Sequence, residues 1–156
     1  MVTLNWCKNQ KKGIKIVEPN DNLSKEYLDS AEETLRVLKE IKGKSKMWVA
    51  TTKYYFEYFL IYSLLIKIGI KCEIHDCTIE TVKILEKNNC LEKGISKKLE
   101  YDKQLRIDNQ YYLKNREVKI DYEELLRLFL YIKNKIKKLT IKEINETRKM
   151  LEMNNA

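Results

Sequence analysis

Glycine and proline are scarce in this chain of 156 residues, which has four glycines and a single proline, Pro19. So few turn-forming residues argue against a fold of many short strands, and no glycine-rich phosphate loop occurs. Lysine, glutamate, leucine and isoleucine are plentiful instead, in long runs at helical spacing. The composition, 44% hydrophobic and 35% charged, is that of a globular protein. We therefore predict an all-α fold, with residues 1–156 forming one helical domain.

Long hydrophobic runs and an apolar leader are also lacking. Within the most apolar stretch, Ala50–Lys71, the longest uncharged run is the nine residues Tyr58–Ile66. That is about half of the ~20 residues that a membrane-spanning helix needs. The first residues, MVTLNWCKNQ, contain no apolar leader core. We therefore expect no membrane span and a cytoplasmic protein, in which all four cysteines stay reduced: Cys7, Cys72, Cys77 and Cys90.

Apolar periodicity and cap residues predict an up-and-down bundle of five to six helices after an extended N-terminal arm over residues 1–20. Trp6 and the cluster around Ile14 are too apolar for a free tail, so we expect part of the arm to pack on the body. The first predicted helix starts at residue 22 or 24 and ends near 43, and the second runs from 45 to 68. The third starts at 76 or 78 and ends around 88–89, and the fourth runs from 96 to 113. The fifth starts at 121 and continues through 136, and a terminal helix runs from 140 to 153.

The predicted helix over 45–68 is apolar on nearly every side, as expected for the central helix of a bundle or for one that also faces a partner subunit. It carries Tyr54, Tyr55 and Tyr58, whose hydroxyls need hydrogen-bond partners when buried. These tyrosines indicate a polar-lined interface. Lys53 and Glu57 lie four residues apart and are expected to pair along the helix surface.

A second group of polar and aromatic residues lies at Arg106–Tyr112. Arg106 follows Asp102 by four residues, so a local ion pair is one interpretation. The other is a ligand-binding face, because Tyr111 and Tyr112 can stack on bases while an arginine meets phosphate. Both interpretations stay open from the sequence.

Positive charge is concentrated near the C-terminal end. The net charge is +8, and the window 133–149 alone has seven basic against two acidic residues, a balance of +5. One interpretation is electrostatic attraction of phosphates, and the other is a solvated face whose lysines complement helix C-termini. The lysines that would supply the attraction are Lys133, Lys135, Lys137, Lys138 and Lys142.

His75 is the only histidine, and three cysteines lie near it in sequence or one helix away. The C-x2-H-x-C spacing of Cys72, His75 and Cys77 is no recurring zinc pattern, so we predict no metal and no cofactor. A Cys–His nucleophilic pair would lack an orienting third group. His75 either fixes the start of the third helix by a hydrogen bond or faces a ligand.

Three stretches together resemble the HEPN superfamily, in particular its small stand-alone archaeal and bacterial members. They are ATTKYYFEYFLIYSLLIKIGIK on the tyrosine-rich helix, CEIHDCTI at the entry to the next helix, and RIDNQYYL on the fourth. The resemblance covers roughly residues 23–137. It implies an up-and-down bundle that commonly dimerises, with a cleft between the subunits.

Many members of that superfamily are metal-independent ribonucleases, often toxins paired with a minimal nucleotidyltransferase. Their motif is an arginine, four to six residues, then a histidine. Here Arg106 matches the arginine, whereas Tyr111 stands where the histidine is expected. Tyrosine, with an ordinary pKa of about 10, is poorly matched to proton transfer at a ribose hydroxyl near neutral pH.

The sequence thus favours a HEPN-like dimer that binds nucleic acid or a nucleotide and works with a nucleotidyltransferase partner. The residues expected to bind are Tyr54, Tyr55, Tyr58, Tyr111 and Tyr112, with His75 and Arg106 as the candidate catalytic residues. One alternative is a metal-independent ribonuclease that uses Arg106 and His75. Another is a purely structural module whose tyrosine helix serves dimer packing.

Overall fold

Cap residues set the helix boundaries in the computed structural model, which describes residues 2–153. The side chains of Asn20, Ser45, Asp121 and Thr140 each accept a hydrogen bond from the backbone N–H three residues on. The predicted caps at Asp121 and Thr140 are confirmed, and the first long helix begins slightly earlier than predicted. The helices are α2 (Asp21–Ile41), α3 (Lys46–Ile68), α4 (His75–Lys87), α5 (Ile95–Gln110), α6 (Tyr122–Lys138) and α7 (Ile141–Met153).

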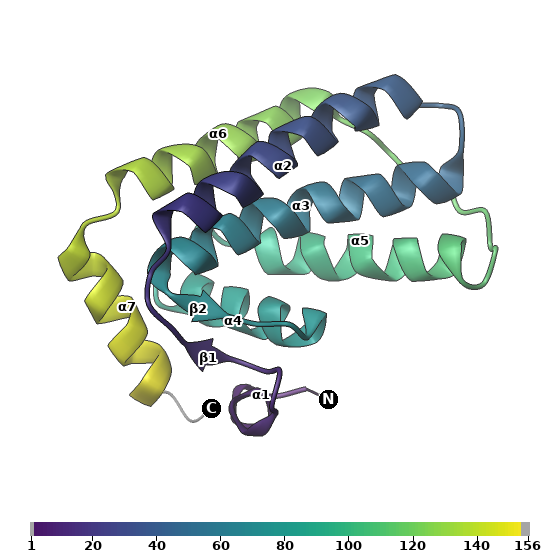
Figure 1. Cartoon of the computed structure of the whole chain (residues 1–156). Helices are drawn as coiled ribbons and strands as arrows, with labels where there is room; N and C mark the ends of the chain where they lie inside the picture. Colours follow the sequence, from purple (N-terminus) through teal and green to yellow (C-terminus); the bar gives the residue numbers. More distant parts are fainter. Residues whose placement is uncertain (1, 154–156) are drawn as a thin grey trace.

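The all-α fold is confirmed, and α3 is its centre (Figure 1). Helix α2 runs along one side of α3 and α5 along the other, while α6 packs against both α2 and α3. Most side chains of α3 are buried, as its apolar character on nearly every side predicts. Within residues 2–153, no helix is both long enough and apolar enough to cross a membrane.

The N-terminal arm differs from the prediction, because it is not extended throughout. Thr3 caps a short helix, α1 (Leu4–Asn9), whose Leu4 and Cys7 are fully buried. Strand β1 (Lys15–Ile16) then pairs antiparallel with β2 (Ile70–Lys71), the segment that follows α3. The arm packs on the body, as predicted, and it raises the number of helices in the described part of the chain to seven.

A disulfide joins Cys7 of α1 to Cys77 of α4. The expectation of four reduced thiols is therefore wrong for this pair, since folding brings together two cysteines that lie 70 residues apart. Cys72 and Cys90 are free thiols, the first buried and the second half-buried.

Helix α7 is held at its middle by Arg148, whose guanidinium donates to the backbone carbonyls of Val17, Ile68 and Gly69. Gly69 ends α3 in the left-handed conformation, with a φ of 89°. A Cβ at this position would lie 2.0 Å from the Arg148 Nη1 atom, so the glycine provides both the turn and the space for the arginine.

Candidate functional site

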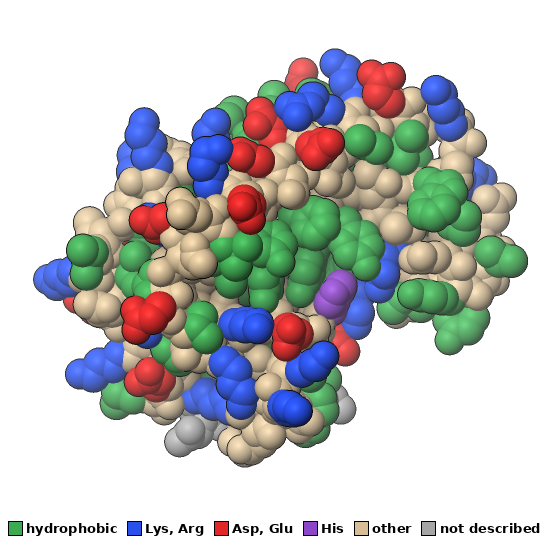
Figure 2. All heavy atoms as spheres, in the orientation of Figure 1, with side chains coloured by type: hydrophobic (Ala, Val, Ile, Leu, Met, Phe, Trp, Pro, Cys, Tyr) green, Lys and Arg blue, Asp and Glu red, His purple; other side chains and the backbone are tan. Residues whose placement is uncertain are grey.

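The tyrosines of α3 form a cluster of rings that extends to α4. Tyr58 stacks on His75 with 4.1 Å between ring centroids, and on Tyr62 with 5.7 Å. Tyr54 and Tyr55 each lie within about 6 Å of the His75 ring as well. Tyr55 and His75 are half-buried, so this cluster reaches the surface. Figure 2 shows a continuous hydrophobic face in a hollow of the surface, with the histidine at its edge.

His75 is the first residue of α4 and is fixed by Tyr54. The Tyr54 hydroxyl lies 2.7 Å from His75 Nδ1, and Tyr54 itself is fully buried. Burial lowers the pKa of His75 below its usual 6.5, and the positive charges of Arg106 and Lys103 lower it further. The imidazole is therefore neutral at pH 7. No described residue forms a hydrogen bond with His75 Nε2.

Arg106 meets the same rings from α5. Its guanidinium carbon lies 4.9 Å from the centroid of Tyr54, 5.4 Å from that of Tyr55 and 5.9 Å from that of Tyr111. The side chain is only 8% exposed, and its buried Nε atom has no hydrogen-bond partner. Across residues 2–153, Arg106 belongs to no salt bridge. It is a buried cation held by aromatic faces and one hydroxyl, Tyr55 Oη at 3.4 Å.

The local ion pair between Asp102 and Arg106 does not form, because Lys53 takes the Asp102 carboxylate at 3.0 Å. The prediction of a surface pair between Lys53 and Glu57 is wrong as well, because Lys53 pairs with Asp102. Glu57 is buried instead, and within the described residues its two carboxylate oxygens and Asp102 Oδ2 have no hydrogen-bond partner. Burial, and then the charge of Asp102, raises the pKa of Glu57 well above 4.5. A protonated Glu57 can share its proton with Asp102 by donating one hydrogen bond to Asp102 Oδ2.

The structure brings together most of the residues that the sequence singled out as a ligand-binding or catalytic set. Tyr112 lies apart from them: it is 67% exposed and has Lys114 over its ring. The predicted basic lysines lie at the C-terminal end of α6 and the start of α7, far to the left of the α4 start in Figure 1. The residues that do gather are Tyr54, Tyr55, Tyr58, Tyr111, His75 and Arg106, which we call the tyrosine–arginine cluster.

Three aromatic residues that extend this cluster were not predicted. Phe59 contacts Tyr55 at 5.6 Å, and Tyr27 of α2 contacts both Phe59 and Tyr62. Phe59 and Tyr62 lie four residues after Tyr55 and Tyr58, so helical spacing alone could have placed them on the same face. Tyr27 comes from another helix and had no such signal. No group of three or more metal-binding side chains occurs among the residues that the structure describes.

Comparisons of this chain with protein-family models, with curated protein sequences and with solved structures return no match. The features of the chain that bear most on function are the buried cation of Arg106 and the tyrosine rings around it.

Proposed function

We propose that the protein is a HEPN-like helical bundle that binds nucleic acid or a nucleotide at the tyrosine–arginine cluster. The observation that supports this proposal most is the environment of Arg106. A buried cation without a carboxylate partner loses hydration with little compensation, and an anionic ligand would supply the missing charge. A phosphate group at the guanidinium would be such a ligand.

The rings beside Arg106 favour a ligand that carries bases as well as phosphate. Tyr55 is half-buried and Tyr111 is 64% exposed, so both present ring surface to solvent next to the guanidinium. Bases stack on such rings without strong sequence preference. His75 adds a neutral imidazole whose Nε2 can donate or accept one hydrogen bond.

The net charge of +8 supports a polyanionic ligand. In this proposal the lysines of α6 and α7 raise the local concentration of nucleic acid without contacting the cluster. The HEPN resemblance further supports a homodimer and a minimal nucleotidyltransferase as partner. Sedimentation velocity tests the first of these, and co-expression with a candidate nucleotidyltransferase followed by pulldown tests the second.

A second candidate function is metal-independent cleavage of RNA. It is favoured by one observation, that Arg106 and His75 both contact Tyr54. In this reaction His75 would accept the proton of a ribose 2′-hydroxyl, the 2′-oxygen would form a bond to phosphorus, and the 5′-oxygen would leave and take a proton from water. Arg106 would stabilise the charge on the phosphoryl oxygens.

The experiment that tests both candidates is binding of a fluorescently labelled single-stranded RNA in EDTA, followed by anisotropy and then by gel analysis of the same samples. We expect the Arg106→Gln and Tyr55→Leu variants to bind at least about tenfold more weakly than the unmodified protein. Arg36→Gln is the matched control, since Arg36 is an exposed arginine on α2 beside Glu32.

Equal binding by the Arg106→Gln variant and the unmodified protein would contradict the proposed site. Cleavage in EDTA that is lost in both Arg106→Gln and His75→Gln would establish the second candidate. Intact RNA in every sample would exclude it. Loss of dimerisation in Tyr55→Leu, with RNA binding unchanged, would instead favour the structural module.

A further inference from the structure

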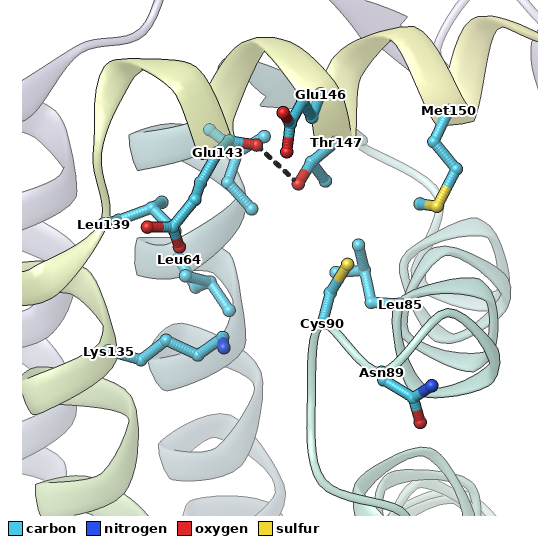
Figure 3. A pocket seen from close by; sticks show the side chains of 11 residues that line it. Leu64, Leu85, Asn89, Cys90, Lys135, Leu139, Glu143, Glu146, Thr147 and Met150 are labelled. Atoms are coloured by element: carbon cyan, nitrogen blue, oxygen red, sulfur yellow. Dashed lines mark hydrogen bonds between the residues drawn. The ribbon is translucent and has the colours of Figure 1, made fainter.

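A separate cavity of about 250 Å³ lies between α7 and the loop that follows α4 (Figure 3). Its floor is apolar and comes from α3 and α4, with Leu64, Ile68 and Leu85 almost completely buried. Met150 of α7 and the free thiol of Cys90 line its sides. The cavity shares no lining residue with the tyrosine–arginine cluster, so it does not depend on the function proposed there.

Charges of both signs line this opening without neutralising one another. Lys135 projects into it from α6, while Glu143 and Glu146 line it from α7 (Figure 3). Over the described residues, Lys135 enters no salt bridge, and the cation nearest to Glu146 is Lys142 of its own helix, at 4.0 Å. Glu143 accepts a hydrogen bond from Thr140 at the start of α7. The ammonium of Lys135 and the carboxylates of Glu143 and Glu146 therefore line one cavity with an apolar floor and form no salt bridge with one another.

A ligand that satisfies this arrangement carries an anion, a cation and a short apolar group. A carboxylate would pair with Lys135 and an ammonium with Glu146, each through charge-assisted hydrogen bonds. The floor formed by Leu64, Ile68 and Leu85 favours an aliphatic or thioether side chain. We propose that the cavity binds a free α-amino acid with such a side chain, of which leucine and methionine are examples.

Size and charge argue against other small ligands. The volume, about 250 Å³, lies just below the range of small-molecule sites, about 300–1,000 Å³, which suits a free amino acid better than a nucleotide. A simple fatty acid would satisfy Lys135 and place no cation at the two glutamates. A simple alkylamine would satisfy the glutamates and leave Lys135 without a counter-charge.

The test compares three probes that share one aliphatic group: L-leucine, 4-methylpentanoate, which lacks the ammonium, and 3-methylbutylamine, which lacks the carboxylate. Binding to the full chain is measured by calorimetry and by the rate at which Cys90 is alkylated. Cys90 reports on the cavity because the other free thiol, Cys72, is buried. We expect leucine to slow alkylation, and each analogue to bind at least about tenfold more weakly.

Lys135→Met is the decisive variant, and Lys133→Met is its control, because Lys133 is an exposed residue of the same helix outside the cavity. We expect leucine binding to be lost in the first variant and unchanged in the second, with both equally stable in urea. Two results would each overturn the proposal: an analogue that binds as tightly as leucine, or leucine binding that is unchanged in Lys135→Met. A third would do the same: no heat of binding and no slowing of Cys90 alkylation with leucine or methionine at millimolar concentration.

Discussion

The hydroxyl of Tyr54 lies 2.7 Å from His75 Nδ1, and this hydrogen bond joins the central helix α3 to the first residue of α4. It holds the imidazole in the orientation that stacks on the ring of Tyr58. Nε2 is then the ring nitrogen that has no hydrogen-bond partner in the described part of the chain. Because His75 is the only histidine in the chain, its titration can be followed as a single set of imidazole signals.

We expect His75 to titrate below 6.5, since burial and the charge of Arg106 both lower its pKa. Replacing Arg106 by glutamine removes that charge and should raise the pKa, whereas Arg36→Gln should not change it. NMR titration of the His75 Hε1 proton measures the shift. A pKa that is the same in Arg106→Gln and in the unmodified protein would show that the guanidinium does not act on the imidazole.

The lowered pKa also has a consequence for stability. The unfolded chain binds a proton at His75 more readily than the folded protein, so stability falls as the pH drops below about 6.5. In His75→Gln this part of the pH dependence should be absent. Urea unfolding at pH 7.5 and pH 5.5 tests the difference, and an equal loss in both proteins would assign the effect to other groups.

Arg106→Met should preserve or increase the stability of the protein while it weakens ligand binding. Methionine keeps an apolar stem among the rings and removes a buried charge that has no carboxylate partner. The cation–π contacts that are lost offset part of the gain, so we expect a change between 0 and about +1 kcal/mol in the free energy of unfolding. Urea unfolding measures it. If the free energy of unfolding falls by about 2 kcal/mol or more, groups of the folded protein already stabilise the charge of Arg106.

Glu57 should make the folded protein less stable as the pH rises. Its pKa is raised in the folded state, so the folded protein binds a proton more strongly than the unfolded chain, and this contribution declines as the pH rises above about 4.5. Glu57→Gln mimics the protonated carboxyl and should remove that decline, giving a larger gain at pH 8 than at pH 5. Glu33→Gln, at an exposed position, is the control. If the gain in the free energy of unfolding of Glu57→Gln is the same at both pH values, Glu57 does not carry the proton that the two carboxyl groups share.

Loss of the disulfide should be costly, because it closes a loop of 70 residues and anchors α1 to α4. We expect Cys7→Ala, or reduction of the unmodified protein, to lower the free energy of unfolding by about 2–5 kcal/mol. Urea unfolding with and without reductant measures the loss. Cys90→Ala provides the comparison, since that thiol is free and its removal should leave the response to reductant intact.

The boundaries of the long helices could be predicted from the sequence because they depend on nearby residues. Ser45 and Asp121 cap helices through backbone groups three residues away, and Gly69 ends α3 by its left-handed conformation. The predicted end of α5, at Leu113, is three residues later than its observed end at Gln110. Leu113 has a φ of 52°, which a right-handed α-helix does not allow. A leucine gives no indication of such a backbone conformation in the sequence.

Contacts between residues far apart in the sequence could not be predicted from local sequence patterns. The spacing of Lys53 and Glu57 predicts a pair on one helix, yet the partner of Lys53 is Asp102 on α5. No local pattern links Cys7 to Cys77, because the two cysteines are 70 residues apart. The sequence marks the tyrosines and Arg106 as unusual residue types, but only the packing of α3 against α5 shows that they meet.

The attachment of α7 determines which positions tolerate sequence change. Among the described residues, the Arg148 guanidinium donates its hydrogen bonds to the main-chain carbonyls of Val17, Ile68 and Gly69, and a carbonyl group is the same whatever side chain its residue carries. Val17 can therefore be exchanged with little effect on α7, whereas Arg148 and Gly69 have to be retained together, one as the donor and the other as the space that the donor occupies. In a homologue or a redesigned variant, we would expect these two positions to change as a pair.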